Sequence, residues 1–260
     1  MTVQTERHGA VMTIRLDRPE SMNAVNLELG NDLLQALGEA ANDDEVRSVL
    51  LTGNGRAFSS GADLRSGFEP TESGHPNVQK ALLERFHPII LALREMPKPV
   101  VAAVNGAAAG IGCSFALACD LIIAGESAYF LLAFVNIGLV PDGGSSFLIP
   151  ERVGFARAAE MAMLGERIPA AKAVEWGLIN RAVSDETLME DAAALADRLA
   201  KGPTRSYAGT KRQLNAWQFS RMQAQLELEA GIQQEMAQSR DFVEGVAAFV
   251  EKREARFDGR

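Results

Sequence analysis

An uncharged stretch at residues 99–119 limits the folds open to this sequence more than any other feature. It is long enough for a helix that spans a membrane. However, it begins with a proline, contains Asn105, and carries glycines at positions 106, 110 and 112. These residues favour a buried strand, a glycine turn and a buried helix over one lipid-facing helix. We therefore expect no membrane span, and a core built around this stretch.

The rest of the first half alternates strand-like and helix-like segments. Val11–Leu16 alternates apolar and polar residues, which is typical of a half-buried strand. Asn26 is suited to cap a helix that carries leucines at helical spacing. Further strands are expected at residues 46–52, 100–104, 121–124 and 179–183. A helix at residues 78–94 should bury one apolar stripe, consisting of Leu82, Leu83, Phe86, Ile89, Ile90 and Leu93.

From residue 185 onwards the pattern changes to helix alone. Four segments show the 3.6-residue periodicity of helices and carry many charges, at residues 185–201, 204–214, 221–238 and 241–256. No linker rich in Gly, Ser or Pro precedes them. We therefore predict an α/β core in residues 1–184 and a C-terminal helical oligomerisation region in residues 185–260.

Charge and cysteine content narrow the class of protein. The chain has 26 Lys and Arg against 34 Asp and Glu, a net charge of −8, whereas nucleic-acid binding depends on basic side chains that neutralise phosphates. We expect no nucleic-acid partner, although a small phosphorylated ligand needs only a few local cations. Cys113 and Cys119 are predicted to be buried free thiols in a reducing compartment. Residues 1–16 lack the apolar segment of a signal peptide, so the expected location is the cytoplasm.

Three carboxylates are the only charged residues between positions 99 and 150: Asp120, Glu126 and Asp142. Ionising a carboxylate in apolar surroundings is costly, so its pKa should rise, as an acid/base that works near neutral pH requires. Asp120 opens a predicted strand and is interpreted as structural. Asp142 lies in a glycine-rich turn and has two interpretations: an N-cap for a helix that begins near Ser145, or a catalytic acid/base.

Generic catalytic and binding motifs fail on inspection. Ser114 lies in a near match to the hydrolase nucleophile elbow, but that triad places its histidine after the serine, and all three histidines precede Ser114. The glycines at 110 and 112 suggest a dinucleotide-binding loop, but Phe115 occupies the third glycine position. No cluster of Cys and His is present, so we expect no metal site.

Two glycine turns are more informative. One contains Gly61, Ala62 and Asp63, and the other begins a predicted helix at Gly110 and Ile111. Glycine-flanked backbone at a strand end or helix N-terminus presents N–H groups to an anion. Two such turns brought together can form an oxyanion hole for a developing enolate. Tight turns use the same glycines for conformational reasons alone, so each turn by itself fits either interpretation.

Several segments together resemble the signature of the crotonase (enoyl-CoA hydratase/isomerase) superfamily. The similarity extends from Val11 to Phe257 and is strongest at residues 56–64, 98–106, 119–124 and 137–141. It implies an α/β fold, a crotonase-like spiral of ββα units with a C-terminal helical trimerisation region. It also implies an acyl-CoA thioester substrate, no cofactor because coenzyme A is part of that substrate, and assembly as a homotrimer or dimer of trimers.

The resemblance also assigns roles to individual residues. The backbone N–H groups of Ala62 and Ile111 would hold the thioester oxygen. Phe249 and Lys252 match hydratase positions that reach the CoA of a neighbouring subunit. Positions that would bind substrate or CoA are Ala24, Ser60, Gly61, Asp63, Leu64, Gly110, Phe134, Phe249 and Lys252.

Departures from the family pattern indicate which branch of the superfamily, hydratase or isomerase, the chain resembles more. Hydratases place two glutamates around the substrate to activate water, and these positions hold Ser114 and Phe134 here. Leu132 and Phe134 would help exclude water. Residues 127–188 resemble the ring-1,2-epoxyphenylacetyl-CoA isomerases of the phenylacetate pathway, whose catalytic aspartate corresponds to Asp142. The resemblance therefore implies an isomerase with Asp142 as its one acid/base, and the alternatives are an enoyl-CoA hydratase or a non-catalytic acyl-CoA-binding protein.

Overall fold

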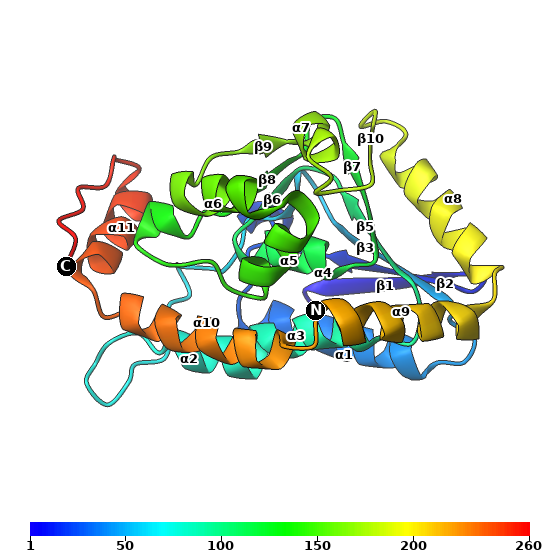
Figure 1. Cartoon of the computed structure of the whole chain (residues 1–260), viewed down its shortest axis with the longest axis horizontal. Helices are drawn as coiled ribbons and strands as arrows, with labels where there is room; N and C mark the ends of the chain where they lie inside the picture. The colour runs from blue at the N-terminus through cyan, green and yellow to red at the C-terminus, as the bar shows by residue number, and fades with distance from the viewer.

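Two mainly parallel sheets form the centre of the computed structural model, which describes residues 1–260 (Figure 1). The larger sheet has the strand order β1-β2-β3-β5-β7-β10, and the smaller has the order β4-β6-β8-β9. The strands are β1 (Val3–His8), β2 (Val11–Leu16), β3 (Ser48–Gly53), β4 (Ala57–Ser59), β5 (Val100–Val104), β6 (Ala107–Ala109), β7 (Leu121–Gly125), β8 (Tyr129–Leu131), β9 (Ile168–Pro169) and β10 (Arg181–Val183).

The chain passes from the larger sheet to the smaller one in each successive unit. Strand β3 is followed by β4, β5 by β6 and β7 by β8, and helices return the chain to the larger sheet. Equivalent strands of successive units pair in parallel: β3 with β5 and β5 with β7, and likewise β4 with β6 and β6 with β8. This arrangement confirms the predicted α/β spiral of ββα units.

Helices cover these sheets and form the C-terminal part of the chain. They are α1 (Leu27–Asn42), α2 (Val78–Ala81), α3 (His87–Glu95), α4 (Ile111–Ala118), α5 (Ser145–Val153), α6 (Phe155–Leu164), α7 (Ala170–Glu175), α8 (Leu188–Ala200), α9 (Thr204–Gln218), α10 (Met222–Met236) and α11 (Arg240–Glu251). Single helical turns precede α1, at η1 (Pro19–Ser21), and α5, at η3 (Val135–Ile137). Asn26 caps α1 as predicted, because its side chain accepts a hydrogen bond from the Leu29 N–H at 2.9 Å.

The helix predicted at residues 78–94 is interrupted. Between α2 and α3 the chain forms a π-helical turn, η2 (Leu82–Phe86), and the His87 N–H bonds the Leu82 carbonyl. Pro88 follows directly and has no N–H to donate, which accounts for the break in the regular ladder. The prediction that Leu83 belongs to the buried stripe is wrong, since Leu83 is 46% exposed whereas the other members of the stripe are buried.

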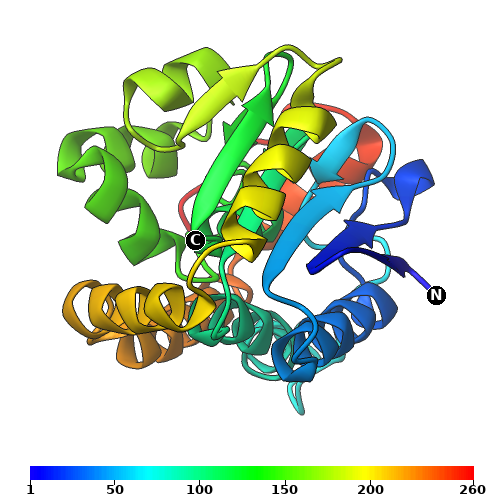
Figure 2. The ribbon, with the colours of Figure 1, turned by 90° about the vertical axis from the view of Figure 1, so that its right-hand side faces the viewer.

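The central strands of the larger sheet, β3 and β5, are buried on both faces. Alternate residues of β5 belong to different clusters: Val100 and Ala102 pack in the main core with α1 and α3, and Val101 faces α8. Figure 2 shows α8 lying across this second face. Helix α8 therefore forms a layer of the core, although it belongs to the region that the sequence assigned to oligomerisation.

The uncharged stretch folds as expected. It forms β5, β6 and the buried helix α4, and no helix of the chain combines the length and apolar character that a membrane crossing requires. Cys113 and Cys119 are buried free thiols, as predicted. Asp120 is structural: its carboxylate accepts hydrogen bonds from the Val100 N–H at 2.9 Å and from Lys211 Nζ at 2.8 Å.

Helices α10 and α11 bring distant parts of the chain to one end of the molecule. Helix α10 packs beside α2 and also contacts α5, and α11 packs against η3 (Figure 1). Segments more than 80 residues apart in sequence therefore meet at the start of α5.

Candidate active site

A cavity of about 320 Å³ lies where the glycine turns, the residues around η3 and helix α11 meet. Of its 20 lining residues, 14 are hydrophobic, and Asp142 is the only carboxylate among them. A mainly apolar cavity with few polar groups is typical of a small-molecule site. The lining residues named by the sequence analysis are Ser60, Gly61, Ala62, Leu64, Gly110, Ile111, Phe134, Asp142 and Phe249.

The two glycine turns touch each other in this cavity. Gly61 has φ +99° and Gly110 has φ +51°, backbone conformations that other residues rarely adopt. A Cβ atom on Gly61 would lie 3.0 Å from the carbonyl oxygen of Ala109 and 3.7 Å from the Cα of Gly110. The structure thus brings together the turns that the sequence singled out, and their glycines permit the close approach.

Two backbone N–H groups at these turns, those of Ala62 and Ile111, have no acceptor in a helix or sheet. Val25 holds both neighbours of Ala62: its N–H bonds the Gly61 carbonyl at 2.8 Å, and its carbonyl accepts the Asp63 N–H at 3.1 Å. The Ala62 N–H donates no hydrogen bond within the chain. Ile111 is the first residue of α4, where N–H groups have no intrahelical acceptor. Since both residues line the cavity, these N–H groups are the candidates for an oxyanion hole.

Asp142 lies in the cavity wall and is only 6% exposed. Its backbone carbonyl accepts hydrogen bonds from Ser114 Oγ at 2.9 Å and Ser145 Oγ at 2.8 Å. Its carboxylate Oδ2 accepts a hydrogen bond from Gln233 Nε2 at 2.6 Å, and Oδ1 is buried without a partner in the chain. The backbone of Asp142 is therefore fixed, and one carboxylate oxygen is free.

The interpretation of Asp142 as the N-cap of α5 is wrong. Gly144 occupies the cap position, and no side chain of that turn caps the helix. Glu229 of α10 performs this role instead: Oε2 accepts the Gly144 N–H at 2.7 Å and Oε1 accepts the Ser146 N–H at 3.1 Å. A carboxylate at a helix N-terminus satisfies free N–H groups and interacts favourably with the helix dipole.

Burial raises the pKa of Asp142 to about 8, against an ordinary value of 3.8. The hydrogen bond from Gln233 opposes this rise, and the nearby negative charge of Glu229 adds to it. Burial also raises the pKa of Glu229, against the effect of its hydrogen bonds to Ser146 and Gly144. A carboxyl group whose pKa is near neutrality can both accept and return a proton, which is what an acid/base must do.

The two positions at which the resemblance expects the glutamates of hydratases hold Ser114 and Phe134. Ser114 is fully buried and donates its hydroxyl to the Asp142 carbonyl. The Phe134 ring lies 3.9 Å from the point where a Cβ on Gly110 would stand. Leu132 is buried but is not part of the lining. Neither glutamate position therefore supplies a group that could activate water in the cavity.

Three predicted substrate-binding residues lie outside the lining: Ala24, Asp63 and Lys252. Asp63 forms an ion pair with Arg18 at 2.9 Å, and the Ala24 carbonyl accepts a hydrogen bond from the same guanidinium. Through Arg18, these two residues support the first glycine turn on the side away from the cavity lining. Lys252 is the exposed residue that ends α11, with φ +56°. Phe249 lines the cavity of its own chain and is 58% exposed.

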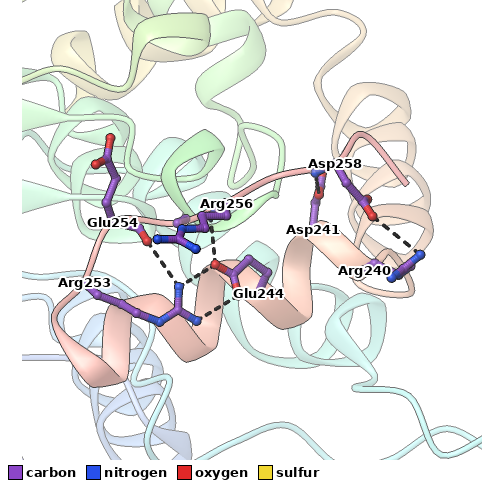
Figure 3. A pocket seen from close by; sticks show the side chains of 8 residues that line it. Arg240, Asp241, Glu244, Arg253, Glu254, Arg256 and Asp258 are labelled. Atoms are coloured by element: carbon purple, nitrogen blue, oxygen red, sulfur yellow. Dashed lines mark hydrogen bonds and ion pairs between the residues drawn. The ribbon is translucent and has the colours of Figure 1, made fainter.

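A charged rim that was not predicted from the sequence follows α11. Arg253 lines the cavity and forms hydrogen bonds with both carboxylate oxygens of Glu244, including Nη2 to Oε2 at 2.8 Å (Figure 3). The carboxylate of Asp241 accepts the N–H groups of Asp258 and Gly259 at 2.8 and 3.0 Å, which ties the tail to α11. A second hollow of about 810 Å³ beside this tail is lined by 8 residues, of which only Ala255 is hydrophobic.

Sequence analysis also missed Gln233 and Glu229, which meet the Asp142 turn from α10. A signal was available, because Gln225, Glu229 and Gln233 are spaced four residues apart and form one polar stripe on the helix. Nothing in the sequence showed which turn they contact. The structure contains no group of three or more His, Cys, Asp or Glu side chains arranged to hold a metal ion.

Known proteins are similar to this chain in sequence and fold. The model for the family "Enoyl-CoA hydratase/isomerase" matches residues 6–260. The chain is 44% identical over 259 residues to a probable enoyl-CoA hydratase of Rhodobacter capsulatus, covering 100% of this chain and 98% of the relative. It is 41% identical over 251 residues to the 1,2-epoxyphenylacetyl-CoA isomerase of Escherichia coli, covering 96% and 95%. The crystal structure of an enoyl-CoA hydratase from Mycobacterium avium subsp. paratuberculosis matches with a TM-score of 0.89 at 36% identity, covering 99% and 98%.

Proposed function

Because this chain belongs to the enoyl-CoA hydratase/isomerase family, we propose that it is an acyl-CoA isomerase. It shifts a double bond or rearranges a ring epoxide in a CoA thioester. The observation that carries this proposal is the cavity with one carboxylate, Asp142, together with the free N–H of Ala62 and the helix-start N–H of Ile111. The relative in Escherichia coli, an isomerase of an epoxide-bearing CoA thioester, supports it.

The oxyanion hole makes the substrate acidic. The thioester oxygen accepts hydrogen bonds from the N–H groups of Ala62 and Ile111, which stabilise the negative charge that develops there. A proton on the α-carbon can then leave, and its electron pair is delocalised as a dienolate onto the thioester oxygen. The apolar lining keeps water away from this charge, so the two hydrogen bonds act in a medium of low polarity.

Asp142 moves the proton. Its carboxylate takes the proton from the α-carbon of a β,γ-unsaturated thioester and returns it to the γ-carbon, which leaves the double bond between the α- and β-carbons. One group acts first as base and then as acid, and no water is consumed. The raised pKa, about 8, makes the protonated form a stable intermediate state of the enzyme.

Hydration is the second candidate, because the relative in Rhodobacter capsulatus is described as a probable hydratase. Hydration requires groups that position and activate a water molecule. The two positions that hold glutamates in hydratases carry Ser114, which is bonded to a backbone carbonyl, and the apolar Phe134. A non-catalytic acyl-CoA-binding protein is disfavoured because Asp142 lies in the cavity wall and does not cap α5.

The assay that tests the proposal compares three activities of the wild type and Asp142→Asn. We expect the wild type to catalyse Δ3-to-Δ2 enoyl-CoA isomerisation or the ring-epoxide rearrangement, and to hydrate crotonyl-CoA slowly. The substitution should reduce isomerisation about 10²–10⁴-fold, since it removes the acid/base. The calorimetric affinity for acyl-CoA thioesters should change little. Rapid hydration that survives Asp142→Asn would establish the hydratase instead, and a wild type that binds thioesters without converting any would establish a binding protein.

We also propose that the chain assembles as a homotrimer or a dimer of trimers. Large apolar side chains are exposed on the outer helices, including Phe155 of α6 at 82% and Trp217 of α9 at 85%. Further exposed apolar side chains lie on the same two helices, Met163 and Leu164 on α6 and Leu214 on α9, and apolar side chains gathered on one surface mark a site of protein contact. Sedimentation equilibrium should give a mass near three or six times 28.0 kDa. A single 28.0 kDa species at micromolar concentration would contradict this assembly.

A further inference from the structure

A polar stripe on α10 is buried against the turn that carries Asp142. Glu229 is 3% exposed and Gln233 is fully buried, although such residues are usually found at the surface. Buried polar groups require hydrogen-bond partners, and both residues find theirs in the segment from Val140 to Ser146. The stripe therefore connects α10 to the proposed acid/base.

We propose that Gln233 is a positioning residue for Asp142: it holds Oδ2, so that Oδ1 is the oxygen that takes up and returns the proton. This inference rests on the proposed function of Asp142. It assigns different roles to the two oxygens of one carboxylate.

The orientation of the Gln233 amide is determined by its partners. The Val140 N–H lies 3.2 Å from Gln233 Oε1, and a backbone N–H can only donate, so the amide oxygen must face it. The amide nitrogen consequently faces Asp142 Oδ2, at 2.6 Å. Because Gln233 has no exposed surface, water does not compete for either contact.

This orientation separates the two oxygens of Asp142. A proton on Oδ2 would point at the N–H of Gln233, which is itself a donor, so the proton of the neutral acid resides on Oδ1. Oδ1 is buried and has no partner in the chain, and a buried polar atom without a partner is costly unless a ligand or a proton completes it. Since Asp142 lines the cavity, a bound thioester is the group that Oδ1 can meet.

Gln233 also adjusts how readily Asp142 ionises. The charged group that acts on Asp142 is Glu229, on the same helix as Gln233. Arg253 lines the same cavity, but its guanidinium is paired with Glu244 and Glu251. Glu229 and burial favour the neutral acid, whereas the Gln233 amide favours the carboxylate. Removal of the amide should therefore raise the pKa of Asp142 further and reduce the fraction of base at neutral pH.

The experiment compares Gln233→Met with the matched variant Gln234→Met. Gln234 is the next residue of α10 and also makes two hydrogen bonds through its amide, with the Gln79 N–H and the Pro76 carbonyl, both at 3.1 Å and both away from Asp142. Infrared difference spectroscopy, with Asp142→Asn to identify the carboxyl band, gives the ionisation midpoint of Asp142 without any turnover. The pH profile of kcat gives the same midpoint in the working enzyme.

We expect Gln233→Met to move the midpoint and the acid limb of kcat upward by about one to two pH units, as loss of a hydrogen bond to a charged group predicts. KM should stay within about twofold. Gln234→Met should lower thermal stability similarly and leave the midpoint unchanged. If Gln233→Met does not fold, Gln233→Asn, whose amide is too short to reach Asp142, should show the same upward shift.

An unmoved midpoint in a folded Gln233 variant overturns the inference, whether or not the protein is an isomerase. An upward shift in both Gln233→Met and Gln234→Met also overturns it, because the effect would then be a general loosening of α10. A shift confined to Gln233 variants in a chain without isomerase activity supports the Gln233–Asp142 coupling and overturns the proposed function. The infrared measurement thus distinguishes failure of the inference about Gln233 from failure of the proposed function.

Discussion

The two sides of the cavity are built in different ways. The side that would hold the thioester oxygen consists of backbone, supplied by Gly61 and Gly110 turns that directly follow short strands of the smaller sheet. The side that would move the proton consists of side chains, and Asp142 and Gln233 are 91 residues apart. The first side depends on local backbone conformation, whereas the second depends on how α10 packs against α5. The two sides should therefore fail in different ways when they are altered.

Apart from the loss of the acid/base itself, the largest effect is expected from Gly61→Ala, which alters the backbone side of the cavity. The new Cβ would lie 3.0 Å from the Ala109 carbonyl and would push the two turns apart. Displacement of one oxyanion-hole donor should lower kcat about 10²–10³-fold. Steady-state isomerase kinetics give the value.

Gly67→Ala is the matched control for this change. Gly67 also has a positive φ, +69°, but a Cβ there would meet nothing within 4 Å. Both variants therefore place an alanine at a positive φ, and only Gly61→Ala also disturbs the contact between the turns. Equal losses of activity in the two variants would show that strain, and not the oxyanion geometry, causes the effect.

A smaller effect is expected when Asp142→Asn alters the side of the cavity that consists of side chains. Here the change is a gain, because the stability of the protein should increase. The folded-state pKa is about 8 and the ordinary value is 3.8, so the folded protein binds the proton more tightly than the unfolded chain. The stability of the native protein therefore decreases as pH rises between these two values. Asn cannot ionise and avoids this loss. Asp142→Asn should raise Tm at pH 8 by about 5 °C, which corresponds to about 2 kcal/mol in a chain of this size.

Calorimetric scans at several pH values check this expectation. The gain should shrink as pH falls from 8 and should disappear below the ordinary pKa of 3.8, where the aspartate is neutral in the folded state and becomes neutral in the unfolded state as well. A gain that is independent of pH would mean that the cost of Asp142 is steric and not ionic.

The smallest effect is expected from Glu229→Gln, which alters the support of Asp142 and not Asp142 itself. Loss of the charged cap of α5 should reduce stability by about 1 kcal/mol. The nearby negative charge also disappears, so the acid limb of the kcat profile should move to lower pH. This direction is opposite to that expected for Gln233→Met. If the acid limbs of Glu229→Gln and Gln233→Met both moved to higher pH, α10 would act on Asp142 through packing alone.

The same contrast explains what the sequence could predict. The crotonase resemblance, the strands β2, β3, β5 and β7, and helix α1 are confirmed, because each depends on a pattern several residues long. The strands β4, β6 and β8 were missed, because three residues are too few to show alternation. The glycine turns were identified from local chemistry, and the structure brings them together.

The environment of Asp142 could be predicted only in part. Its position in an uncharged region predicted a raised pKa, and burial raises it to about 8. Glu229 and Gln233 could not be connected with it, because side-chain contacts between segments 85 and 91 residues apart leave no local pattern. The same lack of a local pattern left the interpretation of Asp142 as the cap of α5 open, although Glu229 performs that role.

The burial of Asp142 has an isotopic consequence. Oδ1 has no partner in the chain, and the side chain is almost inaccessible to solvent. Its proton consequently exchanges slowly with water while a thioester fills the cavity. A substrate deuterated at the α-carbon should therefore transfer much of its label to the γ-carbon of the product in ordinary water, and mass spectrometry of the product would record this internal return. The same reaction in heavy water with unlabelled substrate should incorporate correspondingly little deuterium.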